Sequence, residues 1–471
     1  MKHARCYEKF LELDLLRFPN ILFFVLIYVV SRIPLLNLGF GLDADAWRIA
    51  NTAFDIRHHF IYHASRFPGY PLPEFVNTLV IDFGWLATNS LTVLVSMISV
   101  IVFARILKNL QYKHQGLLVI TYAFLPIIWV NSSNTMDYMW ALLFILLTWF
   151  SLLRKKWIIA GLTMGLAAGS RLPSLVFIVP FVFLTHSQSR SSLTVAKFLC
   201  SSVITTILIY SPLLLAYGWG FIQRYPTHTS LIQTGYLTVK HFGLPGIIAS
   251  LILLISSLPS LRRMLVERSE NDIFIMLSLV VSLVLFALMP YHLEYLISAI
   301  PFAILILYRL ERKTLLIISS ILLLTHSFVA VGSIQHTGKG RIRAQIIDHG
   351  VVFRDIVARQ NQIDFTHALM SAEIDNHSVV IVGPWLPILA YLDKHVSSNQ
   401  KSKMMYDCNI PHAGVQNFHR DILYRYLLDQ DKLEHLLEQN YNIYYINGTR
   451  EYTKTVYGYD LANYRAKYLP I

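Results

Sequence analysis

The sequence predicts an all-α polytopic membrane protein, with about eleven transmembrane helices and a small extracytoplasmic α/β domain at the carboxy-terminal end. Of the 471 residues, 55% are hydrophobic and only 14% are charged, whereas soluble domains carry roughly a quarter charged residues. Long apolar runs recur as far as residue 333, and the chain beyond them is polar. The formal charge is +12, but its Lys and Arg residues cluster in short links between apolar runs. That pattern is typical of a membrane protein and argues against a nucleic-acid partner.

The apolar runs define the predicted spans, because a hydrocarbon core of ~30 Å requires about 20 apolar residues per helix. No small-residue cleavage site follows the first run, which we therefore interpret as a retained span and signal anchor. The short pair at 157–170 and 173–185 also fits one kinked unit or two half-buried helices. The predicted spans lie near residues 20–38, 79–104, 116–131, 137–153, 157–170, 173–185, 194–217, 243–260, 273–290, 292–309 and 314–333.

Basic residues predict the orientation. If the N-terminus is cytoplasmic, every basic cluster falls in a link on the cytoplasmic side, as the positive-inside rule requires. These clusters are Arg105, Lys108 and Lys113; Arg154, Lys155 and Lys156; Arg190 and Lys197; Arg262, Arg263 and Arg268; and Arg309, Arg312 and Lys313. The opposite face then receives the links 39–74, 131–136, the turn at Arg171, 218–242 and 291–294, together with the tail.

The chain is expected to divide into a transmembrane domain, 1–334, and an outer domain, 335–471. In the outer domain, Ser378–Gly383 and Tyr441–Gly448 are typical of buried strands ended by glycine, and Asn417–Gln439 has helical spacing. The three cysteines, Cys6, Cys200 and Cys408, show neither a pairing pattern nor a CxxC motif. Low cysteine usage and the absence of a retention signal favour a bacterial inner membrane.

The first outer link, residues 39–74, is the richest in chemistry. It closes on the rigid turn Pro68–Gly69–Tyr70–Pro71, which ends any helix before the next apolar run. A loop of this composition at a membrane boundary is suited to a charged substrate carried by a lipid. Its ionisable residues include Asp43, Asp45, Arg48, Arg57, His58, His59, His63 and Arg66.

This organisation resembles the GT-C glycosyltransferases, integral membrane enzymes that use sugars linked to lipid phosphates. The motifs are LDADAWR at 42–48, SRFPGYPL at 65–72, GLAAGSRLPSLVFIVP at 165–180 and PYHLEYLISAIPFAIL at 290–305. They look most like the branch of protein O-mannosyltransferases and aminoarabinose transferases. The resemblance covers about the first 310 residues, and for the tail it is only architectural. It implies a polyprenyl-phosphate-sugar donor, a bilayer setting and inversion at the anomeric carbon.

Asp43 and Asp45 are the candidate catalytic residues. Transfer of a sugar to a hydroxyl or amine needs a base that takes the acceptor proton, and a carboxylate at the rim of an apolar cavity has its pKa raised towards a useful range. The resemblance implies that an acid in this loop is that base, and the sequence does not choose between the two. Alternatively, one of them caps a helix that begins near Ala46.

Arg171, Arg48 and Arg66 are the candidates for binding the donor phosphate, because a guanidinium matches phosphate oxygens bidentately and stays charged. Arg171 follows a Gly/Ala-rich helix and precedes Pro173 at membrane depth, where an arginine is costly unless it faces a cavity or a ligand. The alternative is that these side chains extend to the membrane interface.

A third group of residues is expected to contact the substrate: His58, His59, Tyr70, His292 and Glu294. The partner of Glu294 is expected to be Arg171 or a sugar hydroxyl; the alternative is a structural hydrogen-bond network that closes the bundle. Asp55, His59 and His63 recur at i, i+4 and i+8, a conceivable zinc site. The hydrolase motif His-Glu-x-x-His is absent, and the resembled branch does not generally depend on a metal. We therefore predict no metal ligand and no cofactor, and leave a divalent ion as the disfavoured alternative.

The sequence thus favours an inverting glycosyltransferase that acts on the extracytoplasmic side. One alternative is a transporter or a flippase of lipid-linked sugars, although such proteins usually place polar groups near the midplane and show repeated halves. Another is an O-antigen polymerase or ligase, which usually has its key loop late in the chain. The acceptor stays open among protein, lipid and glycan, as does the sugar.

Overall fold

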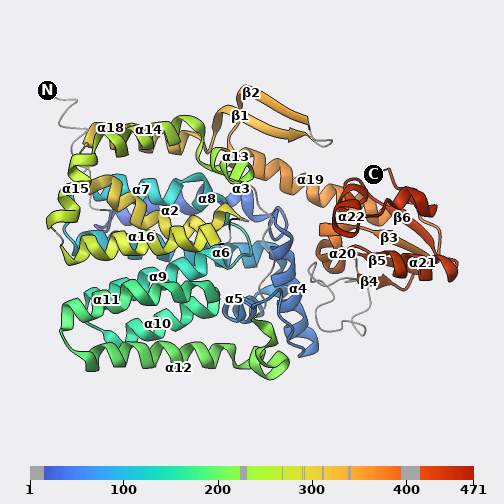
Figure 1. Cartoon of the computed structure of the whole chain (residues 1–471), viewed down its shortest axis with the longest axis horizontal. Helices are drawn as coiled ribbons and strands as arrows, with labels where there is room; N and C mark the ends of the chain where they lie inside the picture. Colours follow the sequence, from blue (N-terminus) through green and yellow to red (C-terminus); the bar gives the residue numbers. More distant parts are fainter. Residues whose placement is uncertain are drawn as a thin grey trace.

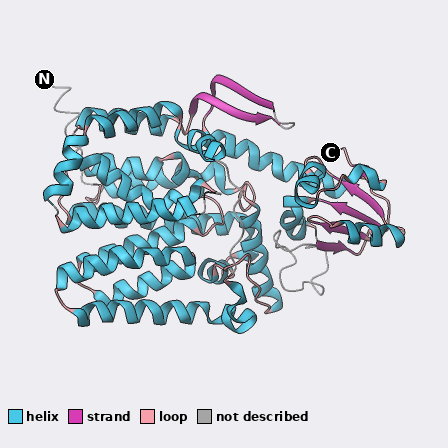
Figure 2. Cartoon of the chain, viewed as in Figure 1, coloured by secondary structure: helices cyan, strands magenta, loops and turns pink. Residues whose placement is uncertain are grey.

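The computed structural model describes residues 15–222, 231–267, 269–288, 290, 292–309, 312–337, 341–393 and 414–470. Cys6, Cys408 and Tyr291 lie outside these residues. The first part of the described chain is a helical bundle, and the strands are confined to the part after α18 (Figures 1 and 2).

The bundle consists of long apolar helices joined by short ones. Its elements, in chain order, are α2 (Asn20–Val30), α3 (Ile33–Leu36), α4 (Ala44–His59), α5 (Pro71–Asn77), η1 (Ile81–Phe83), α6 (Gly84–Asn109), α7 (Gln115–Phe124), α8 (Pro126–Asn131), α9 (Tyr138–Leu153), α10 (Trp157–Ser170), η2 (Leu172–Phe177), α11 (Ile178–Ser189), α12 (Ser192–Tyr217), η3 (Gly218–Phe221), α13 (Leu231–Phe242), α14 (Leu244–Ser256), α15 (Leu258–Glu267), α16 (Glu270–Leu288), η4 (Leu293–Ala299), α17 (Ile300–Arg309) and α18 (Lys313–Thr325).

Each of the eleven predicted spans contains a helix. By length and composition, four helical segments of the described chain can cross a membrane alone, and the bent pair Thr234–Phe242 and Leu244–Ser256 is a fifth if it forms one span. The other apolar helices are shorter, so the number of eleven spans stays a prediction. The four long segments are Ile81–Asn109, Leu172–Ser189, Ser192–Phe221 and Glu270–Leu288.

Helix α10 determines where Arg171 lies. Its glycines Gly161, Gly165 and Gly169 recur every four residues along the face that packs on α12. A Cβ atom at Gly165 would lie 2.5 Å from Thr205 of α12, so only glycine permits this close approach. The helix ends at Ser170, and Arg171 has an extended backbone. The segments 157–170 and 173–185, for which one kinked unit was an alternative, are therefore separate elements.

The chain after α18 forms a hairpin, a long helix and an α/β unit (Figure 1). In the five-stranded sheet the order is β4-β5-β3-β6-β7; β3 pairs parallel with β5 and β6, β6 with β7, and only β4 is antiparallel. The elements are β1 (Val329–Thr337), β2 (Arg341–His349), α19 (Val351–Ser371), β3 (Ser378–Ile381), η5 (Gly383–Trp385), α20 (Leu386–Leu392), β4 (Gly414–Asn417), β5 (Ile422–Arg425), α21 (Gln430–Glu438), β6 (Asn442–Tyr445), α22 (Thr449–Tyr457), η7 (Leu461–Tyr464) and β7 (Lys467–Tyr468).

The strands expected at Ser378–Gly383 and Tyr441–Gly448 are confirmed as β3 and β6. The helix expected over Asn417–Gln439 is wrong in its first half, where β5 is a buried strand, and correct only from Gln430. A short apolar run fits either period, and here the pairing of β5 with β3 and β4 decides for a strand.

The described helices of the first outer link, α4 and α5, lie at the end of the bundle that is nearest the α/β unit (Figure 1). Helix α19 packs on α8, α13 packs on α8 and η4, and α20 packs on α4. Which side of a membrane this end faces stays a prediction. The fold brings the first outer link, the start of α9 and the turn at Arg171 together.

Candidate active site

The amino terminus of α4 presents the two candidate acids. Asp43 is the N-cap residue, with an extended backbone, and its carboxylate accepts a hydrogen bond of 3.0 Å from the backbone N–H of Asp45. The capping role that was the alternative for one acid is therefore confirmed for Asp43. The helix begins at Ala44, two residues before the expected start. A capping contact occupies one oxygen of Asp43 and does not preclude a second role.

Asp45 begins a chain of ion pairs that crosses the site. One of its oxygens lies 2.8 Å from Nη1 of Arg48, and the other lies 2.9 Å from Nε of Arg66. Nη2 of Arg66 then donates to Asp137 at 2.7 Å, and Nη1 of Arg171 donates to the second oxygen of Asp137 at 2.8 Å. Four segments distant in sequence thus supply one buried network, and it brings together all three arginines predicted to bind phosphate.

Aromatic rings hold two of these guanidinium groups in place. The guanidinium carbon of Arg66 lies 3.8 Å from the ring centroid of Tyr70, and that of Arg171 lies 4.3 Å from Tyr138 and 4.6 Å from Tyr295. Such contacts are favourable for a desolvated cation. Tyr70, predicted to bind substrate, therefore lies within the arginine cluster.

The arginine cluster is defined as Arg48, Arg66 and Arg171. Its three guanidinium groups pair with two carboxylates, Asp45 and Asp137. Nη1 of Arg66 is buried and has no hydrogen-bond partner among the residues that the structure describes. A buried donor without a partner is costly, so the cluster is suited to an anionic ligand.

The two acids of α4 differ in their electrostatics. Burial, together with the neighbouring Asp45, raises the pKa of Asp43 to about 6, although His292 and Arg66 oppose the shift. Burial acts in the same direction on Asp45, but Arg66 and Arg48 overcome it and hold the pKa of Asp45 below its usual value. Asp45 is therefore a fixed anion, whereas Asp43 can take up a proton near neutral pH.

His292 and Glu294 lie where η4 meets the site. His292 is exposed and lies close enough to Asp43 and Asp45 to lower the pKa of each. Glu294 lines a small cavity with Arg171 and Tyr295. Glu294 makes no ion pair with Arg171, which pairs with Asp137 instead; Nε2 of His241 lies 4.0 Å from the Glu294 carboxylate. Contact of Glu294 with a sugar hydroxyl stays a prediction.

Asp137 is the site residue that the sequence analysis missed. It is fully buried and bridges two arginines from the position just before α9. Its signal was present, because an acid at the outer end of an apolar span is expensive unless paired or functional.

The histidines of the first outer link lie at the other end of α4. The helix has 16 residues, so at 1.5 Å per residue His58 and His59 are roughly 20 Å from Asp43 and Asp45. His58 pairs with exposed Asp82, while His59 and His63 both contact the buried carboxylate of Asp55, at 3.1 and 2.6 Å. Within the described ranges, no group of three or more His, Cys, Asp or Glu side chains is placed to hold a metal ion.

Glu74 holds the segment that carries Arg66 against the start of α5. It is fully buried, and its carboxylate accepts hydrogen bonds from the backbone N–H and hydroxyl of Ser65 and, at 2.8 Å, from the hydroxyl of Tyr62. These contacts fold residues 62–66 back onto the start of α5.

Replacement of Glu74 by alanine is expected to loosen this segment, because three donors lose their acceptor and each unsatisfied group costs about 1–3 kcal/mol. Limited proteolysis should then cleave residues 60–66 faster than in the wild type. Glu74→Gln is the matched control: its carbonyl still accepts from Ser65, and the Tyr62 hydroxyl can accept instead of donate. Equal cleavage rates in wild type and Glu74→Ala would contradict the role of Glu74.

Comparisons with known proteins place this geometry in context. No known protein family matches the chain, and neither does any curated protein. One solved structure is partly similar to this chain: the crystal structure of ArnT from Cupriavidus metallidurans in the apo state, with 16% identity and a TM-score of 0.42. The match covers 64% of this chain and 59% of ArnT, so the chain spans less than two thirds of that protein. At this identity and TM-score the match carries no assignment of function.

Proposed function

We propose that this chain is an inverting membrane glycosyltransferase that moves a sugar from a polyprenyl-phosphate-linked donor to an acceptor on the extracytoplasmic side. One feature carries this proposal: a buried cluster of three arginines, in which Nη1 of Arg66 has no hydrogen-bond partner among the described residues, lies beside Asp43. An anion-binding group next to a carboxylate that titrates near neutral pH supplies the two groups that such a transfer needs. The first binds the phosphate, and the second accepts the proton of the acceptor.

In the proposed reaction, a hydroxyl or amine of the acceptor attacks the anomeric carbon, and the bond from that carbon to the phosphate oxygen breaks. Asp43 accepts the acceptor proton as the new bond forms. The electron pair of the broken bond stays on the phosphate oxygen, where Arg66 and Arg171 neutralise the growing charge. The products are the glycosylated acceptor and polyprenyl phosphate, with the configuration inverted and no covalent adduct.

Each residue of the site then has a distinct role. Asp45 and Asp137 hold the guanidinium groups in register before the donor binds. His292 and Glu294 are the residues proposed to contact the sugar; Glu294 lines the same cavity as Arg171, and His292 acts on Asp43. The mechanism uses no metal ion. Its partners are the donor lipid, the bilayer and an acceptor that is a protein, a lipid or a glycan, in a bacterial inner membrane.

The alternative of a transporter or flippase fits the site less well. Its ionisable groups gather at one end of the bundle, whereas transporters usually bind their substrate near the midplane. An O-antigen polymerase or ligase is disfavoured by the early position of the acidic loop.

Replacement of Arg171 by lysine tests the phosphate-binding role. Lysine keeps the charge but loses the planar fork that matches carboxylate and phosphate oxygens, so we expect the KM for the donor to rise about tenfold or more. The measurement is transfer of radiolabelled sugar from polyprenyl-phosphate donors in membranes that contain the chain. Arg190→Lys is the matched control, because Arg190 is 76% exposed and pairs with Glu270 away from the site. An unchanged KM in Arg171→Lys would contradict the role, and no transfer by the wild type from any donor would contradict the function.

A further inference from the structure

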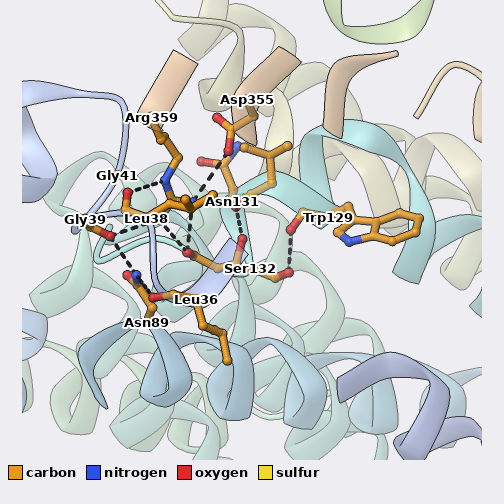
Figure 3. A network of polar contacts seen from close by, with 12 residues as sticks. Leu36, Leu38, Gly39, Gly41, Asn89, Trp129, Asn131, Ser132, Asp355 and Arg359 are labelled. Carbon is orange, nitrogen blue, oxygen red and sulfur yellow. Dashed lines mark hydrogen bonds and ion pairs between the residues drawn. The ribbon is translucent and has the colours of Figure 1, made fainter. Parts of the chain in front are cut away.

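Helix α19 reaches from the carboxy-terminal part of the chain into the two loops that carry the site acids (Figure 3). Its Arg359 is fully buried and donates to backbone carbonyls of both loops. Nε donates to the carbonyl of Leu38 and Nη2 to that of Gly39, each at 3.0 Å. Nη1 and Nη2 both donate to the carbonyl of Ser133, each at 3.3 Å. One side chain therefore joins two segments that are about a hundred residues apart.

These contacts lie close to the acids in sequence. Gly39 precedes Asp43 by four residues, and Ser133 precedes Asp137 by the same number. The two acids' segments meet again at Arg66, which pairs with both Asp45 and Asp137. The separation of the loops at Arg359 therefore constrains the geometry of the ion-pair network.

Further residues of α19 add contacts to Arg359 and to the loop before Asp43. Asp355, one turn before Arg359, lies 3.5 Å from its guanidinium group. Gln362, nearly one turn after it, donates to the carbonyl of Leu42 at 2.9 Å, directly before Asp43. The loops also join each other, because the N–H of Thr135 donates to the carbonyl of Phe40 at 2.7 Å. Buried carbonyls outside regular structure need such donors, and α19 supplies them.

The outer α/β unit is connected to the same place by a second route. Its α20 packs on α4, where Nδ2 of Asn51 donates to the carbonyl of Pro387 at 2.9 Å. Tyr391 of α20 lies edge-on to Phe40 and Trp47, at 4.7 and 6.1 Å between ring centroids. Asp45 lies in the first turn of the same helix, α4.

We propose that Arg359 is a positioning residue: it fixes the distance between the loops of Asp43 and Asp137, which makes the carboxy-terminal part of the chain a component of the site rather than a separate module. A guanidinium suits this role because its five N–H donors are held in a rigid planar fork, whereas an ammonium offers three donors at one point on a flexible stem. The role of this geometry in sugar transfer rests on the proposed function. The positioning of the two loops by Arg359 does not depend on that function.

The first test is independent of activity. Amide hydrogen exchange is measured on the purified full chain for wild type, Arg359→Gln and Arg359→Lys. We expect faster exchange in residues 38–45 and 133–137 in Arg359→Gln, and a smaller change in both segments in Arg359→Lys. Arg354→Lys is the matched control: it lies on the same helix, and its guanidinium donates to Ser333 and to the carbonyl of Lys240 instead of to these loops. Unchanged exchange of both segments in Arg359→Gln would overturn the proposal.

The second test separates positioning from folding. In the transfer assay, kcat per folded molecule is expected to fall about 100-fold in Arg359→Gln, because a small misplacement of reacting groups costs that much. Arg359→Lys should recover part of the loss, and Arg354→Lys should keep the wild-type kcat. If the variants only reduce the amount of folded protein, with kcat per folded molecule unchanged, Arg359 is merely structural. If the wild type transfers no sugar, the proposed function fails, while hydrogen exchange still decides the role of Arg359.

Discussion

Asparagine in place of Asp43 is expected to lower the rate of sugar transfer about 10²–10⁴-fold, the usual contribution of a general base, without unfolding α4. Asparagine caps a helix as well as aspartate does, so the contact with the N–H of Asp45 survives the change. The measurement is the rate of transfer per folded protein, with the thermal midpoint measured on the same sample. Loss of rate at an unchanged midpoint identifies a base.

Asp43→Ser separates the two roles of this residue further, because serine is also a good N-cap but has no carboxylate. Both variants should be about 10²–10⁴-fold slower if Asp43 is the base. If both keep the wild-type rate, Asp43 is only a helix cap, and the mechanism must use another group.

The acidity of Asp43 also predicts how the wild-type rate depends on pH. Burial and Asp45 raise the pKa of Asp43 to about 6, and only the deprotonated form accepts a proton. The rate should therefore be high above this pKa and fall as the pH drops through it. A rate that stays constant between pH 7 and pH 5 would contradict Asp43 as the base.

Asp137→Asn is expected to have the largest effect on stability. Asp137 is fully buried and bridges Arg66 and Arg171. Its loss leaves two buried guanidinium groups without their shared carboxylate, and removal of one partner of a buried ion pair costs about 3–5 kcal/mol. The measurement is thermal unfolding of the detergent-solubilised chain.

Asp82→Asn provides the matched control for this change. Asp82 also has two partners, Arg57 and His58, but it is 37% exposed. Exposed pairs contribute little to stability because water and salt screen them, so the midpoint should stay near that of the wild type. Equal thermal midpoints for wild type and Asp137→Asn would show that Asp137 does not stabilise the ion-pair network.

The sequence was most informative where one physical rule acts over a long stretch. Apolar runs located helices in each of the eleven ranges, and the alternation of basic links grouped the first outer link with the turn at Arg171. The same grouping brought Asp45, Arg66 and Arg171 together as candidates. Neither the apolar runs nor the alternation of basic links predicts individual contacts.

The contacts themselves depend on packing between segments distant in sequence. Nothing in the spacing shows that Asp137 lies between Arg66 and Arg171, or that Arg359 binds carbonyls more than 200 residues before it. Apolar periodicity also fails for β5, whose short run becomes a strand only because β3 and β4 lie beside it. Site residues at opposite ends of one helix, such as Asp43 and His59, are neighbours in sequence but not in space.

The most direct measurement uses the purified chain in liposomes, with a polyprenyl-phosphate sugar labelled separately in the sugar and in the lipid, and with acceptors from a bacterial envelope extract. For the wild type we expect labelled sugar on an acceptor and an equal amount of free polyprenyl phosphate, and for Asp43→Asn both products at a rate about 10²–10⁴-fold lower. If the donor instead crosses the bilayer with its sugar still attached and no polyprenyl phosphate is released, the chain moves lipid-linked sugars rather than transferring them.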